Sequence, residues 1–412
     1  MSSPTDPPSP PARLLDITRL IRRAGRRPTG IDRVELAYLQ HLGRDAVPLF
    51  ALARSAWGYI LLDRDGIEDI AARLTGARPW GQADLLSLLA RRLAPGIRRA
   101  ESDLRRAACA RCRPGGLARM LRRHLPGGFS YLNVGHSNLS ARTLRGVRRG
   151  GAGRVAVMVH DVIPLEFPHY QRPGTPEAFR ARLQRVRAQA DLILYNSADT
   201  RARAEARMWA WGPVPDGVVA HLGVEPPEPG DLPPGIDPER PYFVALGTIE
   251  PRKGHDLLLD LWEELGAEMG PAVPGLILCG ARGWNNQAVF DRLDRLPPGG
   301  PVQELAGLDD ARIAALLLHS RGLLFPSRAE GYGLPPIEAA ALGVPVVSGD
   351  LPSVREILGN IPVYVKESER YQWLSAVKTL SKGQRAPGEA AGKAGFVPPG
   401  WKDHFNIVLR FA

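Results

Sequence analysis

The feature of this sequence that most constrains its fold is a pair of series in which apolar, strand-like runs alternate with helical stretches. The first series contains the strand-like runs FSYLNVG, RVAVMVHDVIP and ADLILYNS and the helical stretches PEAFRARLQRVRAQ and SADTRARAEARMW. The second runs from YFVALGTIE through HDLLLDLWEELGAEM, PGLILCG, ARIAALLLHS, RGLLFPS, EGYGLPPIEAAALG, PVVSGD and PSVREILG to IPVYV. This alternation is typical of parallel sheets with crossover helices, so we predict an α/β protein.

Two domains are expected, because 412 residues exceed the roughly 100 to 200 residues that one domain usually holds. Proline and glycine are concentrated at 225–241, between the two series. We predict two Rossmann-like, doubly wound parallel-sheet domains facing across a cleft, where ligands bind at the carboxyl ends of strands. The expected parts are a first domain over 13–230 with a basic helical segment at about 67–125, a linker over 231–240, a second domain over 241–390, and a segment over 391–412 that packs back across the domains.

The remaining bulk features predict a cytoplasmic protein. Residues 1–12, MSSPTDPPSPPA, have neither a basic nor an apolar region and are expected to form a disordered leader, not a signal peptide. No run of about 18 uncharged apolar residues exists to span a bilayer. The three cysteines are an odd number, which fits a reducing compartment better than a disulfide framework.

Two short patterns superficially resemble metal sites. Cys109 and Cys112 form a CxxC surrounded by arginines, without the second pair or histidines that a zinc site needs. Asp63 and Asp65 follow an apolar run and precede Gly66, which is also the pattern of an ordinary turn. We therefore predict no metal site.

The net charge of +11 raises the question of an anionic partner. Arginine pairs at 91/92, 98/99 and 105/106 recur at seven-residue intervals, which would place them on one side of a helix, although Pro95 breaks any single long helix. Such a face, with Leu93, Ile97, Leu104, Leu117 and Leu121 among it, suits the surface of an anionic membrane or a lipid-linked acceptor. The alternative, which the sequence supports equally well, is that these arginines form a basic face exposed to solvent with no partner. Nucleic acid is not expected, because no aromatic residues are interleaved.

Near the N-terminus, RLLDITRLI (13–21) is predicted to be a strand and IDRVELAYLQHL a helix, with a loop between them. Thr29 or Asp32 can cap that helix, and Gly30 would let the backbone approach a ligand at its N-terminus. Residues 46–66 are expected to form a peripheral hairpin.

The most specific pattern is FPSRAEGYGLPPIEA, in which Glu330 and Glu338 lie eight residues apart where a strand leads into a helix. Pro335 or Pro336 suits the first turn of that helix, and the free N–H groups there favour a phosphate. The carboxylates can accept hydrogen bonds from sugar hydroxyls. Arg252 and Lys253, just after the first strand of the second series, can bind a diphosphate and stabilise a charged leaving group.

Together, GTIEPRKGHDLLLDLW, FPSRAEGYGLPPIEAAALGVPVV and HDVIPLEFP resemble family 4 of the retaining glycosyltransferases, particularly the mannosyltransferase-like members of bacterial capsule and O-antigen assembly. The resemblance covers roughly residues 13–365 and is strongest over 242–356. It implies the GT-B fold, with an acceptor domain followed by a nucleotide-sugar donor domain. One departure is the single glycine in PTGID, where many relatives have two.

The resemblance also implies roles for individual residues. Glu330 would contact the hydroxyls of the donor sugar and Glu338 the nucleotide ribose, while Arg252 and Lys253 would bind the donor phosphates. His160 of HDVIP would line the sugar pocket from the first domain. Asp161 could share that site, or the two residues could form a buried, hydrogen-bonded corner that takes no part in the chemistry. The remaining expected donor-binding residues are Gly30, Gly247, Gly331, Tyr332, Gly333 and Leu334.

The implied reaction is metal-independent, retaining transfer of a hexose, with mannose favoured, to a glycan or lipid-linked acceptor. GDP-mannose is the favoured co-substrate, and no cofactor is expected. The departing phosphate would take the acceptor's proton in a front-face attack. Two rivals stay open: a nucleotide-sugar epimerase of the same fold, and a non-catalytic sugar-nucleotide or glycan-binding subunit of a polysaccharide assembly complex.

Overall fold

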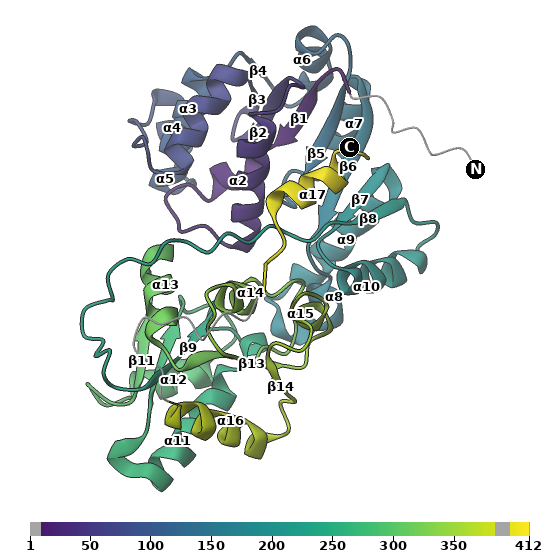
Figure 1. The fold of residues 1–412 in the computed structure, drawn as a ribbon. Coiled ribbons are helices and arrows are strands. Elements are labelled where there is room, and N and C mark those ends of the chain that lie inside the picture. The colour runs from purple at the N-terminus through teal and green to yellow at the C-terminus, as the bar shows by residue number, and fades with distance from the viewer. Residues whose placement is uncertain (1–9, 384–395, 412) are drawn as a thin grey trace.

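The computed structural model describes residues 10–383 and 396–411, and their strands form two sheets, one in each half of the chain. Figure 1 shows the two halves as separate α/β bodies joined by a long irregular connection that precedes β9. Residues 1–9 of the leader predicted over 1–12 lie outside the described residues, as does the whole stretch 384–395. The α/β architecture predicted from the alternating pattern is confirmed.

The first sheet has the strand order β4-β3-β2-β1-β5-β6-β7-β8. Neighbouring strands are parallel, apart from the antiparallel pairs β2–β3 and β3–β4 at one edge. The predicted hairpin is thus the β2–β3 pair. The strand bounds are β1 Arg13–Asp16, β2 Leu49–Ser55, β3 Gly58–Leu62, β4 Ala110–Cys112, β5 Phe129–Asn133, β6 Ala152–Val159, β7 Leu192–Tyr195 and β8 Asp216–Val219.

The helices of this half cover both faces of the sheet (Figure 1). Ser197 caps α10 as its sequence predicts, since its side chain accepts a hydrogen bond from the Thr200 amide. The helix bounds are α1 Thr18–Arg22, α2 Gly30–Leu42, α3 Arg64–Leu74, α4 Leu85–Leu89, α5 Pro95–Arg106, α6 Leu117–His124, α7 Ala141–Arg149, α8 Ile163–Glu166, α9 Thr175–Gln189 and α10 Ala198–Trp209.

The second sheet is parallel throughout and has the order β11-β10-β9-β12-β13-β14. The strand order reverses between β9 and β12, the point at which doubly wound sheets bind ligands. The elements of this half are β9 Tyr242–Leu246, α11 His255–Met269, β10 Gly275–Cys279, α12 Gln287–Asp294, β11 Val302–Leu305, α13 Asp310–His319, β12 Gly322–Phe325, α14 Leu334–Ala341, β13 Val346–Gly349, α15 Pro352–Leu358, β14 Val363–Val365 and α16 Arg370–Lys382, with a 3-10 turn η2 at Pro251–Lys253.

Several local predictions need correction. The strand predicted over 13–21 ends at Asp16, whose carboxylate accepts a hydrogen bond from the Thr18 amide as α1 begins. Asp63 caps α3 by accepting from the Gly66 amide, so the Asp63–Asp65 pair marks a helix start. β8, β11, α12 and α16 were not predicted, because their runs are short or lie in segments rich in proline, glycine or charge.

The basic helical face predicted from the arginine pairs is wrong. Arg91 and Arg92 precede α5, which starts at Pro95, so the three pairs do not share one helix. Arg105 and Arg106 form ion pairs with Asp84 and Asp103. Of the apolar residues assigned to that face, Leu104, Leu117 and Leu121 are buried in the core.

The C-terminal helix α17 (Trp401–Val408) lies beside the first half of the molecule (Figure 1). The Phe405 ring stacks on His41 at 3.7 Å between ring centroids and contacts Tyr38 edge-on at 4.8 Å. His404 Nε2 is 2.7 Å from the Tyr38 hydroxyl. One apolar cluster, which includes Val34, Val244 and Phe405, runs through both halves of the molecule.

No helix in the described part of the chain combines the length and the apolar composition that crossing a membrane requires.

Docking of α17 predicts that Phe405→Ala will destabilise the protein. Phe405 is 1% exposed, and truncating a buried aromatic ring costs about 3 kcal/mol or more. Ile407→Ala, in the same helix at 37% exposure, is the matched control and should cost less than about 1 kcal/mol. Urea titration followed by circular dichroism measures both, and equal losses in the two variants would contradict the packing described.

Candidate functional site

The predicted cations and Glu330 meet at the reversal point of the second sheet. Lys253 lies in the turn after β9, and Glu330 lies in the loop after β12. Lys253 Nζ is 2.5 Å from Glu330 Oε1, and the Arg252 guanidinium is 2.9 Å from the same oxygen. Arg252 also pairs with Glu250 at 2.7 Å and donates to the Ala329 carbonyl. A single carboxylate oxygen thus joins the loops that follow two adjacent strands.

The electrostatics keep Glu330 ionised. Burial alone would raise its pKa, but the positive charges of Arg252 and Lys253 outweigh burial and lower the pKa of Glu330 to about 2. Burial lowers the pKa of Lys253, although Glu330 opposes that effect. The cluster therefore places Arg252 and Lys253 around a carboxylate that is ionised at neutral pH.

Glycines make room for this arrangement. A Cβ on Gly247 would lie 3.1 Å from Lys253 Cε, and Gly247 has a φ of +141°, which side chains disfavour. Gly254 has a φ of +68°, and a Cβ there would lie 2.4 Å from the Pro326 carbonyl oxygen. The lysine side chain thus crosses directly over a glycine backbone, at a position where a larger residue would displace it.

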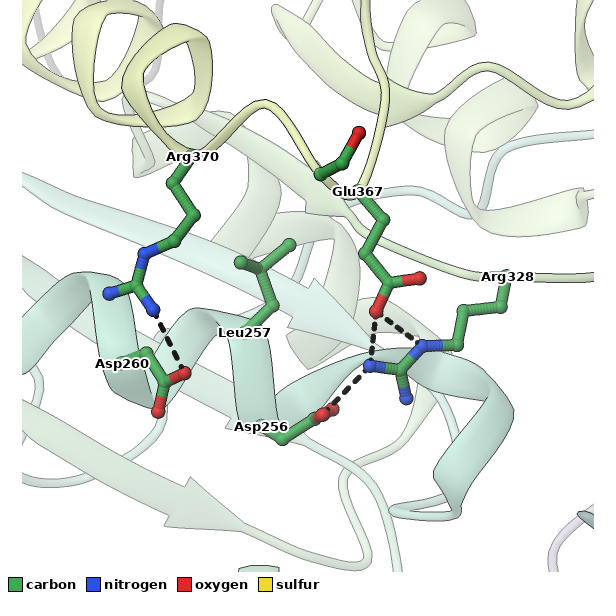
Figure 2. A pocket seen from close by; sticks show the side chains of 7 residues that line it. Asp256, Leu257, Asp260, Arg328, Glu367 and Arg370 are labelled. Atoms are coloured by element: carbon green, nitrogen blue, oxygen red, sulfur yellow. Dashed lines mark hydrogen bonds and ion pairs between the residues drawn. The ribbon is translucent and has the colours of Figure 1, made fainter.

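Arg328 supports the cation-bearing turn from the opposite side. Its guanidinium donates to the Pro251 carbonyl and to Asp256, and its amide donates to the Arg252 carbonyl at 2.7 Å. Figure 2 shows Arg328 in a surface hollow, where it also pairs with Glu367. Asp260, in the same hollow, pairs with Arg292 and Arg370. The charges of the hollow pair with one another, so we assign the hollow a supporting role.

The loop after Glu330 reaches into the first half of the molecule. The Gly331 carbonyl accepts hydrogen bonds from the Ser197 and Thr200 hydroxyls, at 3.1 and 2.9 Å. The Tyr332 hydroxyl donates to the Leu222 carbonyl at 2.8 Å. A Cβ on Gly331 would lie 2.1 Å from the His160 carbonyl oxygen. Glycine at this position therefore brings the Glu330 loop against the end of β6.

His160 comes immediately after β6 and is buried. Its Nε2 is 2.6 Å from the Val134 carbonyl oxygen, which fixes the ring with Nε2 protonated as the donor. Burial lowers the pKa of His160 to about 4, so the ring is neutral at pH 7. Asp161 accepts from the Ile163 amide, and burial raises its pKa while Arg252 opposes the rise. His160 and Asp161 thus lie on the first-domain side of the Glu330 loop.

Gly30 and Glu338 meet across the same interface. Gly30 begins α2, and a Cβ there would lie 3.1 Å from Leu334 Cδ1 at the start of α14. Glu338 lies in the second turn of α14. Arg33 of α2 donates to Glu338 Oε1 at 2.6 Å. Burial raises the pKa of Glu338, and Arg33 opposes that rise.

The structure therefore groups the predicted residues around two carboxylates. Arg252, Lys253 and Gly247 surround Glu330, whereas Glu338 pairs with the first domain. Arg33 was not singled out from the sequence, although it lies three residues after Gly30 in PTGIDR. Arg328 was also missed, because a surface arginine gives no sequence signal of the three segments it contacts.

The cysteines are free thiols in the structure. Among the described residues, no group of three or more His, Cys, Asp and Glu side chains is placed to hold a metal ion.

The contact of Gly331 with His160 predicts that Gly331→Ala will strain the domain interface. Because the added methyl would meet backbone, we expect a loss of about 1–3 kcal/mol of unfolding free energy. Gly266→Ala, in α11 with nothing within 4 Å, should be neutral or stabilising by up to about 1 kcal/mol. Thermal unfolding of the two variants checks this, and a neutral Gly331→Ala would refute the contact.

Comparison with known proteins finds a family match over the part of the chain that contains Arg252, Lys253, Glu330 and Glu338. Residues 233–384 match the family model of glycosyl transferases group 1. The chain is 32% identical over 226 residues to the serotype-specific mannosyltransferase WbdA of Escherichia coli, covering 51% of this chain and 27% of that protein. It is 40% identical over 147 residues to the O-antigen chain mannosyltransferase RfbU of Salmonella typhimurium, covering 34% of this chain and 38% of RfbU. The chain thus matches well under half the length of these relatives.

Solved structures share the fold over nearly the whole chain. The trehalose-6-phosphate synthase OtsA superposes with a TM-score of 0.57 at 14% identity, covering 97% of this chain and 95% of OtsA. Alr3699/HepE of Anabaena, solved in complex with UDP and glucose, gives 0.56 at 14% identity, covering 96% and 95%. Residues 233–384 therefore match the glycosyl transferases group 1 model within a two-domain GT-B fold, and parts of the chain are similar to O-antigen mannosyltransferases.

Proposed function

We propose that this protein is a retaining glycosyltransferase that moves a hexose, with mannose favoured, from a nucleotide-sugar to a glycan or lipid-linked acceptor in bacterial surface polysaccharide synthesis. The observation that carries the proposal is the buried cluster of Arg252, Lys253 and Glu330 at the reversal point of the second sheet. The similarity to O-antigen mannosyltransferases supports mannose as the sugar and GDP-mannose as the donor.

The cluster suits a sugar diphosphate. Arg252 and Lys253 together offer a planar guanidinium and a compact ammonium to phosphate oxygens. Glu330 holds both of them through Oε1, which leaves Oε2 to accept a hydrogen bond from a sugar hydroxyl. Glu338 likewise uses Oε1 for Arg33, and its Oε2 can accept from a ribose hydroxyl. Gly30, Leu334 and the rest of the Gly331–Gly333 loop would enclose the donor between the domains.

The proposed chemistry is front-face attack by the acceptor. The bond between the anomeric carbon and the leaving phosphate oxygen breaks as the acceptor oxygen forms its bond on the same face, and the departing phosphate takes the acceptor's proton. Arg252 and Lys253 stabilise the charge that develops on that phosphate, a task that a divalent metal performs in other transferases. We propose that neither a metal nor a further cofactor is needed.

Side chains other than the cations would position the sugar. Glu330 is a poor candidate for a covalent nucleophile, because its pKa of about 2 and its two cationic partners mark a weakly basic carboxylate. His160 is neutral, and its Nε2 is already committed to Val134. We propose that His160 shapes the sugar pocket and does not carry charge or transfer protons.

A cytoplasmic setting belongs to the same proposal. Cys109, Cys112 and Cys279 are all free, which suits a reducing compartment.

The proposal predicts slow hydrolysis of one donor by the purified protein. We would screen GDP-mannose, UDP-glucose and UDP-N-acetylglucosamine with and without EDTA, and we expect release of GDP from GDP-mannose that EDTA does not change. Lys253→Ala should lower the release at least about 100-fold, because it removes a cation that stabilises the leaving group. Lys402→Ala, an exposed lysine on α17, is the matched control and should be unaffected.

Other outcomes would redirect the proposal. If no sugar nucleotide binds, the non-catalytic subunit becomes the better account. If the recovered nucleotide-sugar contains the epimeric sugar, the protein is an epimerase. Loss of activity in EDTA that is restored by a divalent cation would refute metal independence alone. Retention is checked by the anomeric configuration of the glycosidic bond in the product formed with an acceptor.

A further inference from the structure

The first domain carries an exposed apolar surface that the donor site does not use. Helix α4 (Leu85–Leu89) presents Leu85 at 80% and Leu89 at 67% exposure, with Leu86 and Leu88 also exposed. The indole of Trp57, from the β2–β3 turn, is 47% exposed and donates to the Leu86 carbonyl at 3.2 Å. We call these five residues the leucine patch. Figure 1 shows α4 at the outer side of the first half, away from the second half.

In α4 the polar side chain is buried and the apolar side chains are exposed, the reverse of an ordinary surface helix. Ser87 is fully buried against α5, and the Ser87 amide donates to Asp84 at the N-terminus of the helix. Asp84 is held by two hydrogen bonds from Arg105, at 2.6 and 2.7 Å, and its amide donates to Ser102. Polar side chains therefore anchor α4 to the domain while its leucines face outward. An amphipathic helix in water normally has the opposite arrangement.

Asp84, the acidic residue directly before the patch, is paired with Arg105, and the segment that follows it carries positive charge only. From Leu85 to Arg99 the sequence LLSLLARRLAPGIRR contains four arginines and no acidic residue. Arg91, Arg92 and Arg99 are exposed and have neither an ion pair nor a hydrogen-bonded side-chain partner within the described residues. In contrast, Arg105 and Arg106 farther along α5 are paired. Free cations thus adjoin exposed leucines in one short segment.

We propose that the leucine patch, with Arg91, Arg92 and Arg99, docks on the surface of an anionic lipid bilayer. The leucines and the Trp57 ring would enter the boundary between headgroups and acyl chains, and the guanidiniums would contact lipid phosphates. A second copy of the chain fits less well, because a symmetric contact through this patch would bring six unpaired arginines together. The surface shares Arg91, Arg92 and Arg99 with the basic face expected from the arginine spacing. Its apolar residues differ, because most leucines of that expected face lie in the core.

Vesicle sedimentation with the full chain tests this docking. We expect binding to vesicles of phosphatidylglycerol and phosphatidylcholine, at least tenfold weaker binding to phosphatidylcholine alone, and weakening of the anionic binding by salt. Replacing Arg91, Arg92 and Arg99 together by Gln should weaken binding to the anionic vesicles at least about 30-fold. The double variant Leu85→Ser, Leu89→Ser should weaken it at least about tenfold.

Matched controls separate docking from general effects. Arg142, Arg145 and Arg149 are exposed on α7, and replacing all three by Gln removes the same charge elsewhere on the domain. That variant should retain binding to within about threefold, and thermal unfolding should show every variant folded. Absence of anionic vesicle binding would overturn the proposal, as would equal loss in the α7 variant. A dimer that dissociates in the leucine variant, without vesicle binding, would assign the patch to self-association.

Discussion

The arrangement of the second domain depends on the Glu330 carboxylate. Through one oxygen it joins the turn after β9, which carries Arg252 and Lys253, to the loop after β12. Breaking a buried ion pair by removing one partner costs roughly 3–5 kcal/mol, because the other charge stays buried without compensation. Removing the Glu330 carboxylate would leave both Arg252 and Lys253 without this partner. The same contact that would orient the donor phosphates in the proposed function therefore also fixes the shape of the reversal point of the sheet.

The contact between the domains follows from the next residues of the same loop. Gly331 lies against the His160 backbone because it lacks a side chain, and its carbonyl accepts hydrogen bonds from Ser197 and Thr200. Five residues into α14, Glu338 pairs with Arg33 of the first domain. The stretch from Glu330 to Glu338 thus carries both the ion pairs of the second domain and the inter-domain contacts, so the packing between the domains and the position of Glu330 are physically coupled.

Local patterns in the sequence predicted much of the fold and part of the site. Continuous apolar runs located β9, β10 and β12, and Ser197 marked the start of α10. The meeting of Lys253 with Glu330 followed from their places after strands of a parallel sheet. Side-chain pairings between residues that are distant in the sequence could not be predicted from it. Arg33 and Glu338 are 305 residues apart, and Arg105 and Asp84 are 21 residues apart. Arginine spacing alone therefore predicted a basic face where the structure buries the leucines and pairs two of the cations.

A calorimetric comparison of GDP and GMP binding tests the role proposed for Arg252 and Lys253. In the proposed function, Arg252 and Lys253 bind the second phosphate of the nucleotide. Wild-type protein should therefore bind GDP at least about tenfold more tightly than GMP, and the double variant Arg252→Gln, Lys253→Gln should lose that preference while its GMP affinity changes little. Equal affinity for GDP and GMP in the wild-type protein, or a preference that survives in the double variant, would contradict it.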